Sequence, residues 1–199
     1  MARTRANDYR EKQRKILDAA ATVLARVGTE KASMAEIARE SGTSKASLYH
    51  YYESKSALIF DIIHTHLSDL EKALNVADQP HLPPSERLRQ LVGAVLAEYE
   101  DAGAKHTVQL NGKSGLPAEQ VSELLTMERQ VTNRFALVLQ DIDPSLKKKP
   151  SLLMPLTMSL FGMLNWTDQW FRAEGPMSRD EYASLVTSLF LHGILKNNT

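Results

Sequence analysis

The spacing of apolar residues is the feature that most constrains the fold of this chain, because it is helical along almost the whole length. Apolar side chains recur every three or four residues, and no segment alternates apolar and polar residues as a half-buried strand does. Gly and Pro interrupt the pattern at a few places, and the intervals between them predict an all-α fold of about nine helices. The expected helices span residues 8–27, 34–41, 45–51, 55–76, 84–102, 104–112, 118–141, 152–173 and 178–196.

Composition narrows the class of protein further. The 199 residues are 43% apolar and 24% charged, which is enough to form a buried core. The chain has no cysteine, so disulfides and thiolate chemistry are excluded. Its apolar runs are too short to span a membrane, and the basic N-terminus is not followed by the apolar segment of a signal peptide. We therefore expect a cytoplasmic protein without a membrane partner.

The net charge is zero, but the charges are unevenly distributed. Residues 1–60 contain 11 Lys and Arg and 7 Asp and Glu, so this segment is basic while the remainder is acidic. The cations at the N-terminus are Arg3, Arg5, Arg10, Lys12, Arg14 and Lys15. Such an arm is typical of a segment that meets a polyanion, and it is equally compatible with a solvated basic tail.

Two short helices separated by only Gly42, Thr43 and Ser44 form a helix-turn-helix pattern. Ser33 and Glu36 have the spacing of a capping box at the start of the first helix, and Ser44 is the expected N-cap of the second. In such a unit the second helix enters the major groove of DNA. Here that helix begins with small, polar or basic residues, which can approach base edges closely.

The second helix of this pattern has an inner and an outer face. Leu48 and Tyr52, four residues apart, are expected to face inward. Tyr49, His50 and Tyr51 are consecutive, so a short helix cannot bury all three and some of them must face outward. The alternative structure is a plain αα-hairpin inside a helical bundle.

The residues of this motif resemble those of the TetR/AcrR family of bacterial one-component repressors. The resemblance is carried by Ser-Met-Ala-Glu-Ile-Ala at 33–38 and Gly-Thr-Ser-Lys-Ala-Ser-Leu-Tyr-His-Tyr-Tyr-Glu-Ser-Lys at 42–55, within about residues 10–70. The number and lengths of the later helices also suit this family. The family usually has Phe at the position of Tyr52, so this chain carries an additional hydroxyl that needs a partner.

The resemblance implies a homodimeric regulator that binds a palindromic operator in double-stranded DNA and is released by a small ligand. It implies an arm and DNA-binding domain at 1–54, with the motif at 33–52, and an effector-binding and dimerisation domain at 55–199. The positions that read bases in the family correspond to Ala35, Lys45, Ala46, Ser47 and His50, beside Thr43 and the capping Ser44. Those that contact phosphate correspond to Ser33, Tyr49, Tyr51 and Lys55. The basic arm would reach a minor groove or the flanking backbone.

The last two long helices of the pattern contain an apolar seam. The candidate dimer-interface residues are Leu160, Leu164, Phe171, Tyr182, Leu185, Val186, Leu189, Phe190 and Gly193. Gly162 and Gly193 inside these helices each cost about 1 kcal/mol relative to alanine, and close approach of another helix would account for them. The resemblance implies a four-helix interface with a second subunit. The alternative is that the seam packs only within its own chain.

A ligand pocket is expected among the helices of the second domain. Its candidate lining consists of Tyr99, His106, Gln109, Met127, Val131, Arg134, Phe135, Met158, Phe161 and Asn165. The polar members are the informative ones, because a polar group on an inner face needs a partner. The alternative is that the Met and aromatic residues are plain core. No cofactor or metal is expected beyond this small-molecule effector.

The segment 166–178 resembles one in TetR-family regulators of fatty-acid, sterol and phenylacetate catabolism, whose effectors are commonly acyl-CoA or aryl-CoA thioesters. A ligand of this kind needs an apolar tunnel for the acyl part and cations for its phosphates, for which Lys105, Arg129 and Arg134 are candidates. The main rival effector is a hydrophobic drug or an aromatic acid, with control of efflux.

Enzymatic function is disfavoured by the motifs. The sequence has no Gly-rich phosphate loop, no Gly-x-Ser-x-Gly and no His-Glu-x-x-His. We therefore expect a regulator and not an enzyme, with a helical scaffold or an enzyme without known motifs as remote alternatives. The sequence leaves the operator, the regulated genes and the effector undetermined.

Overall fold

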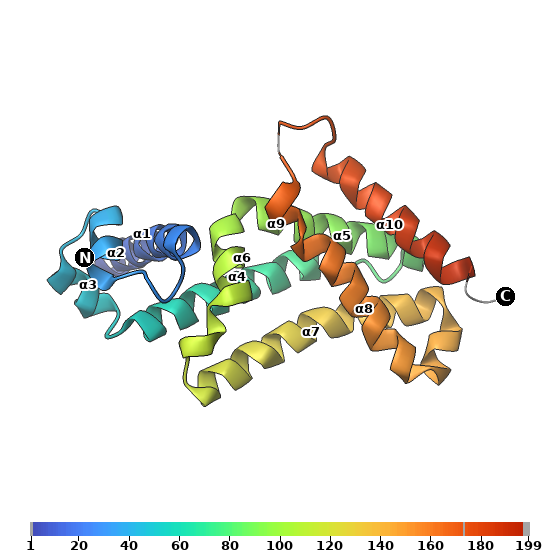
Figure 1. Ribbon diagram of the computed structural model, residues 1–199, viewed down its shortest axis with the longest axis horizontal. Coiled ribbons are helices and arrows are strands. Elements are labelled where there is room, and N and C mark those ends of the chain that lie inside the picture. Colours follow the sequence, from blue (N-terminus) through green and yellow to red (C-terminus); the bar gives the residue numbers. More distant parts are fainter. Residues whose placement is uncertain (1, 173, 197–199) are drawn as a thin grey trace. The chain divides into compact units, whose positions relative to one another are not determined.

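The computed structural model describes residues 2–172 and 174–196, and over these ranges the protein is helical without any strand. The long helices are α1 (Ala2–Val27), α4 (Lys55–Ala77), α5 (Pro84–Asp101), α7 (Ala118–Ile142), α8 (Pro150–Asn165) and α10 (Arg179–Lys196) (Figure 1). The shorter ones are α2 (Met34–Glu40), α3 (Lys45–Tyr51), α6 (Gly103–Asn111) and the single turn α9 (Thr167–Trp170), with 3₁₀ turns η1 (Lys113–Gly115) and η2 (Pro144–Lys148). The predicted all-α class is therefore confirmed.

Two helices differ from the sequence-based expectation by more than one residue at a boundary. α1 begins at Ala2 and not at residue 8, because no Gly or Pro precedes Gly28 to interrupt it. The N-terminal arm is thus part of a helix, while the side chains of Arg3 and Arg5 lie outside the described residues. The expected helix 152–173 begins earlier, at Pro150, and divides at Trp166, whose amide donates to the carbonyls of Gly162 and Leu164 and so ends α8.

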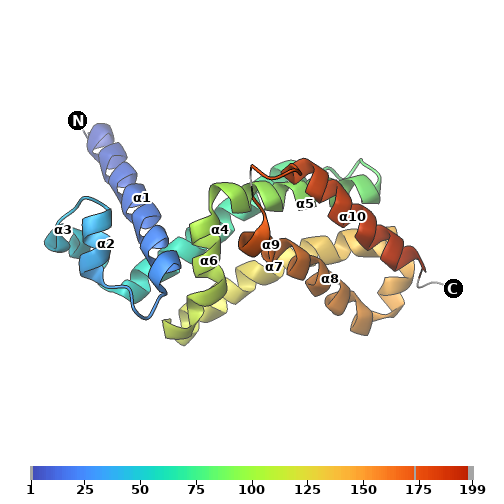
Figure 2. The same cartoon turned by 45° about the horizontal axis from the view of Figure 1, so that its top comes forward.

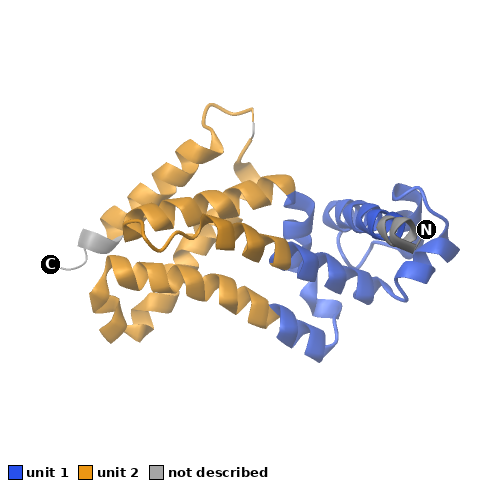
Figure 3. Cartoon of the chain, turned by 180° about the vertical axis from the view of Figure 1, so that it is seen from behind, with its two compact units in different colours: residues 1–67, 102–124 blue, residues 68–101, 125–199 orange. Residues whose placement is uncertain are grey.

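The chain packs into two compact units (Figure 3). The first comprises Met1–Leu67 and Ala102–Leu124, and the second comprises Ser68–Asp101 and Leu125–Thr199. α6 belongs to the first unit because it packs against α1, with Lys105 Nζ 2.7 Å from Asp18 Oδ1. The predicted division into 1–54 and 55–199 separates the segments by their expected functions and not by their packing. It stays a prediction.

The core of the first unit is built around α1. Its fully buried stripe includes Ile16, Ala20 and Leu24, which recur at intervals of four residues. α2 and α3 lie next to one another beside α1 (Figure 2). Leu48 is the buried residue that anchors α3 in this core.

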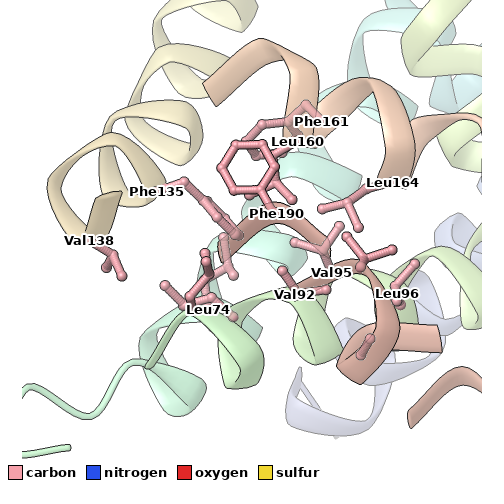
Figure 4. Packing of buried hydrophobic residues seen from close by; sticks show 14 of the residues in the cluster. Leu74, Val92, Val95, Leu96, Phe135, Val138, Leu160, Phe161, Leu164 and Phe190 are labelled. Carbon is pink, nitrogen blue, oxygen red and sulfur yellow. The ribbon is translucent and has the colours of Figure 1, made fainter. Parts of the chain in front are cut away.

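The core of the second unit joins five helices in one apolar cluster (Figure 4). Phe135 of α7 and Phe161 of α8 meet edge to face, with ring centroids 5.0 Å apart. Val95 of α5, Leu74 of α4 and Phe190 of α10 complete this cluster from the other helices. α10 packs along α5, which accounts for the buried half of the predicted seam.

Candidate functional site

The turn between α2 and α3 is fixed by backbone hydrogen bonds and one glycine. Gly42 has φ 64°, which an L side chain tolerates poorly. The amide of Thr43 donates to the Ala38 carbonyl at 2.9 Å, and that of Gly42 donates to the Arg39 carbonyl at 3.2 Å. This pair of bonds is a Schellman motif, which ends α2 and directs the chain into α3 after three residues.

The two short helices begin with serine caps, as predicted. Ser33 Oγ accepts from the Glu36 amide at 3.2 Å, and Ser44 Oγ accepts from the Ser47 amide at 3.1 Å. The return contact of the expected capping box is absent from this part of the structure, because the Glu36 carboxylate instead lies 3.5 Å from Arg26 Nη2. The backbone of the helix-turn-helix is therefore held by local bonds that leave the outer side chains of α3 available.

The outer face of α3 carries the residues predicted to meet DNA. Leu48 is 0% exposed, whereas Lys45, Ala46, Tyr49 and His50 lie on the solvent side. The other predicted contacts are Ser33, Ala35 and Ser44, which are exposed, and Thr43, Ser47, Tyr51 and Lys55, which are half-buried. The face presents an ammonium, an imidazole and hydroxyl groups, which are suitable donors and acceptors for base edges and phosphates.

Tyr51 makes a contact that the sequence did not predict. Its ring stacks on that of Tyr9 in α1, with centroids 4.7 Å apart, and Lys12 Nζ lies 6.0 Å from the Tyr51 centroid. The N-terminal part of α1 therefore reaches the end of α3 and places a cation beside it. Tyr9 lies outside the buried stripe of α1, so the sequence could have indicated an aromatic side chain on the outer face of this helix. Only the fold shows that its ring meets that of Tyr51.

Lys55 holds the loop before α2. Its Nζ donates to the carbonyls of Ala32 at 2.9 Å and Glu30 at 3.1 Å. Ser54 caps α4, accepting from the Ala57 amide at 3.0 Å. The ammonium of Lys55 is thus used within the chain, and its predicted phosphate contact stays a prediction.

The additional hydroxyl of Tyr52 has partners on two other helices. It donates to Asp61 Oδ2 of α4 at 2.5 Å and accepts from Gln13 Nε2 of α1 at 3.1 Å. Gln13 Nε2 also donates to Asp61 Oδ2 at 3.3 Å. Burial and the neighbouring Asp61 carboxylate raise the pKa of Tyr52, so its hydroxyl remains a donor at neutral pH. Neither Gln13 nor Asp61 was singled out from the sequence.

The candidate effector residues fall into two groups, one in each unit. In the first unit, His106 and Gln109 are buried, with His106 Nδ1 3.3 Å from Gln109 Oε1, and the ring of His66 lies 5.7 Å from that of His106. In the second unit, Tyr99 donates to Asn165 Oδ1 at 2.9 Å beside the apolar cluster. Burial raises the pKa of Tyr99, which therefore stays protonated.

The remaining members of the predicted pocket are in the second unit. Val131, Phe135 and Phe161 belong to its core, whereas Met127 is half-buried and Met158 is exposed on α8. The structure thus brings the polar pair Tyr99 and Asn165 to the same apolar cluster as the aromatic residues. It places Met158 outside that cluster.

All three cations proposed for ligand phosphates have partners within the chain. Arg134 donates to Asn75 Oδ1 at 2.5 Å and lies 3.6 Å from Asp78 Oδ2, while Lys105 pairs with Asp18. Arg129 is exposed and donates to Thr126 Oγ1 at 3.2 Å. The sequence could not show the partners of Arg134, because they come from another helix.

Residues 170–172 and 175–177 of the segment 166–178 line an apolar groove in the second unit. The groove has a volume of about 360 Å³, and its lining includes Trp170, Phe171, Pro176, Met177 and Tyr182. Trp170 stands edge-on to Tyr182 with centroids 5.1 Å apart, and Arg172 also lines the groove. Both tryptophans are exposed, but Trp170 at the end of α9 contacts the rings of Phe171 and Tyr182, so the predicted alternative of packing at a helix end describes Trp170.

The predicted dimer seam has a buried half and an exposed half. Leu160, Leu164, Tyr182, Val186 and Phe190 are buried within the second unit, as the alternative of packing within the chain requires. Leu185, Leu189 and Gly193 are exposed, and Phe171 is half-buried. The seam residues of α10 therefore lie on two faces of that helix, whereas those of α8 are buried.

No helix within 2–172 or 174–196 is long and apolar enough to cross a bilayer. Nor does the described part of the chain gather three His, Asp or Glu side chains into a possible metal site.

Comparisons with known proteins agree with this arrangement. Residues 16–62 match the family model described as bacterial regulatory proteins, tetR family, and residues 81–194 match the tetracyclin repressor-like C-terminal domain. A TetR-family transcriptional regulator from Bordetella parapertussis is 32% identical in its solved structure, with a TM-score of 0.87 over 92% of this chain and 96% of that one.

Two more distant proteins are similar over most of their length. The HTH-type transcriptional repressor KstR2 of Mycolicibacterium smegmatis is 22% identical, covering 92% of this chain and 90% of the relative. AibR, solved in complex with isovaleryl coenzyme A and operator DNA, is 22% identical, with a TM-score of 0.76 over 89% of this chain and 97% of that one. The relatives are transcriptional regulators and not enzymes, which confirms the predicted class. This chain belongs to the TetR family of DNA-binding transcriptional regulators.

Proposed function

We propose that this regulator is a homodimeric repressor that binds a palindromic operator through α3 and is released by a CoA thioester. The observation that carries the proposal is the two-sided character of α3, in which Leu48 is fully buried while Lys45, Ala46 and His50 face outward. A helix that is anchored by one face and begins with small or polar side chains on the other face can enter a major groove. Ala35 and Ser47 complete the proposed base-reading set, and Ser33, Tyr49, Tyr51 and Lys55 the phosphate contacts.

The operator contacts are tested with DNA from upstream of the protein's own gene. Lys45→Ala is expected to weaken binding by about 1–3 kcal/mol and to relax the preference at one base pair, because an ammonium can donate to guanine. Lys147→Ala, which removes an exposed lysine from η2 in the second unit, is the control of equal charge. Fluorescence anisotropy at fixed salt measures both. Equal affinities for the two variants would refute the assignment of Lys45.

The exposed half of the seam supports the homodimer. Leu185 and Leu189 of α10 and Met154 and Met158 of α8 are exposed apolar side chains on neighbouring helices. A Cβ added at Gly162 or Gly193 would meet no atom of the same chain within 4 Å. A glycine inside a helix lowers its stability relative to alanine, and no close packing within the described part of the chain offsets this loss. Close approach of a second copy would offset it.

The dimer is tested by a charge on the seam. Leu189→Glu is expected to give a monomer that loses operator affinity, because the carboxylate would be desolvated at the interface. Leu137→Glu on α7 is the matched control, since Leu137 is 61% exposed and Leu189 is 60% exposed. Sedimentation velocity reports the mass of both. A Leu189→Glu variant that remains dimeric would refute this interface.

Three observations support a CoA thioester as the effector. The segment 166–178 lines an apolar groove that includes Arg172. The hydrogen bond between buried Tyr99 and half-buried Asn165 adds a polar group beside an otherwise apolar core. AibR, which has the same fold, was solved with isovaleryl coenzyme A. Among the proposed phosphate ligands, Arg129 is the most accessible, and Arg134 would have to leave Asn75 and Asp78.

The effector class is tested by titrating the operator complex with isovaleryl-CoA, free CoA and isovalerate. The thioester is expected to weaken operator binding about a hundredfold, which requires about 2.7 kcal/mol of coupling, while CoA and isovalerate alone act weakly. Release by an aromatic acid or a hydrophobic drug, without any effect of thioesters of several acyl lengths, would favour the rival class.

A further inference from the structure

The cluster of Gln13, Tyr52 and Asp61 joins three helices of the first unit at one point. Tyr52 is the C-cap of α3, Gln13 lies on α1 and Asp61 lies on α4. Tyr52 is 6% exposed, and its hydroxyl is within hydrogen-bond distance of both other side chains. Thr65 Oγ1 lies 3.5 Å from the second oxygen of Asp61 and extends the cluster along α4.

The hydroxyl of Tyr52 is not required to fill the core. A phenylalanine, which the family usually has at this position, would occupy the same space with its ring. The hydroxyl instead adds a directional bond to a carboxylate, and bonds to charged groups are the stronger kind. Without it, Asp61 would keep only the long contacts from Gln13 at 3.3 Å and Thr65 at 3.5 Å.

The recognition helix depends strongly on such contacts. α3 has seven residues, which is too short to be stable as an isolated helix. Leu48 is its one buried residue, and a single apolar anchor allows a helix to rotate and tilt around it. A hydrogen bond to Asp61 at the C-terminal end of α3 restricts that tilt, because it adds a second fixed point.

We propose that Gln13, Tyr52 and Asp61 are positioning residues for operator binding, which fix the angle of α3 against α4 and α1. The cluster transmits the position of α4 to the reading helix without touching DNA itself. This inference rests on the proposed reading role of α3. Residues that only stabilise the fold of the first unit would also lower the melting temperature when they are replaced. The test must therefore separate operator affinity from stability.

The test compares Tyr52→Phe with the double variant Tyr52→Phe/Asp61→Ala in the full-length protein. Tyr52→Phe is expected to lower the melting temperature and to weaken operator binding about tenfold, with binding to unrelated DNA unchanged. The double variant removes both partners, so the half-buried Asp61 carboxylate is no longer left without the donor hydroxyl, and the melting temperature is expected to rise again. Operator affinity should stay about tenfold below wild type, because α3 still lacks its second fixed point.

Two controls complete the design. Thr157→Val removes another buried hydroxyl, which donates to the Leu153 carbonyl at 2.9 Å in α8, and is expected to lower stability without changing operator affinity. Lys45→Ala reports whether α3 reads DNA at all. If Lys45→Ala weakens binding and Tyr52→Phe does not, the positioning role is wrong while the proposed function stands.

The double variant provides the second decisive result. Recovery of operator affinity together with the melting temperature would also overturn the positioning role, because stability alone would then explain the loss. If neither Lys45→Ala nor Tyr52→Phe changes operator affinity, the proposed reading role of α3 fails and this inference fails with it.

Discussion

Arg87 of α5 is the centre of an ionic network in the second unit, and its loss should destabilise the protein measurably. Its guanidinium bonds Asp78 through Nε at 3.0 Å and Nη2 at 2.9 Å, and its Nη1 lies 3.3 Å from Asp141 Oδ2. The side chains of Arg87 and Asp78 are 14% and 16% exposed. Arg134 pairs with Asp78 from the other side. The network therefore ties the end of α4 to α5 and α7.

The expected loss of unfolding free energy depends on how deeply the Arg87 and Asp78 pair is buried and on the partners that Asp78 keeps. Removing one member of a fully buried pair costs about 3–5 kcal/mol, because the other charge is left uncompensated. In Arg87→Met, Asp78 keeps Arg134 at 3.6 Å, and Asp141 is exposed enough to be solvated. We therefore expect a loss of about 2 kcal/mol, which corresponds to a decrease in melting temperature of about 4–8 °C for a chain of this size.

Arg89 provides the matched control, since it also lies on α5 and pairs with Glu86 at 2.6 Å. These side chains are 41% and 37% exposed, so Arg89→Met should cost at most about 0.5 kcal/mol. Thermal unfolding followed by circular dichroism at one protein concentration and at two salt concentrations compares the variants. Equal shifts for Arg87→Met and Arg89→Met would refute the reasoning, and so would a difference that vanishes in high salt.

Two further predictions concern single side chains. Leu48→Ala should cost about 2–5 kcal/mol and abolish operator binding, because Leu48 is the buried anchor of α3; thermal unfolding and anisotropy measure the two effects, and retained operator binding would contradict it. Glu181→Gln should lower stability slightly at pH 7, and this loss should shrink at acidic pH. The backbone amide of Ser178 holds the pKa of Glu181 below its ordinary value, so its contribution is present above the unfolded pKa and is lost as the pH falls through the folded one. Melting temperatures across pH test this, and a pH-independent difference would contradict it.

The sequence predicted the helix-turn-helix almost to the residue because the signals there are local. Ser33, Ser44 and Ser54 each cap the helix that they precede, and Gly42 takes the positive φ that ends α2. Each of these effects acts within five residues, so the order of residues alone contains it. The fold class followed from the helical spacing of the apolar residues, and the family was indicated by the resemblance of the motif residues.

The partners of polar side chains could not be predicted in this way. Tyr52 needed an acceptor, but the choice of Asp61, and of Gln13 as a donor, depends on how α1, α3 and α4 cross. Arg134 was expected to bind a ligand because its partners on another helix are invisible in a periodic pattern. Sequence reasoning identifies which groups need a partner, and the packing of the helices supplies it.

α4 contains Asp61 and ends directly before Asp78, so it connects the cluster of Gln13, Tyr52 and Asp61 with the ionic network of Arg87. The sequence predicted neither of these clusters. Asp61 belongs to the first unit, and Asp78, directly after the end of α4, belongs to the second. Sites without shared partners should affect stability additively within about 0.5 kcal/mol. Operator affinity should behave differently, because a disturbance at the Asp78 end can reach α3 along α4 through the Tyr52 cluster.

We therefore expect Arg87→Met to weaken operator binding about threefold in the wild-type background and not at all in the Tyr52→Phe background. Tyr52→Phe disconnects α3 from Asp61, so a loosened far end of α4 no longer matters to the reading helix. A double-mutant cycle on operator affinity and on unfolding free energy measures both couplings. Additivity in both quantities would mean that α4 does not transmit its position to α3, whereas coupling in affinity alone would identify α4 as the connection.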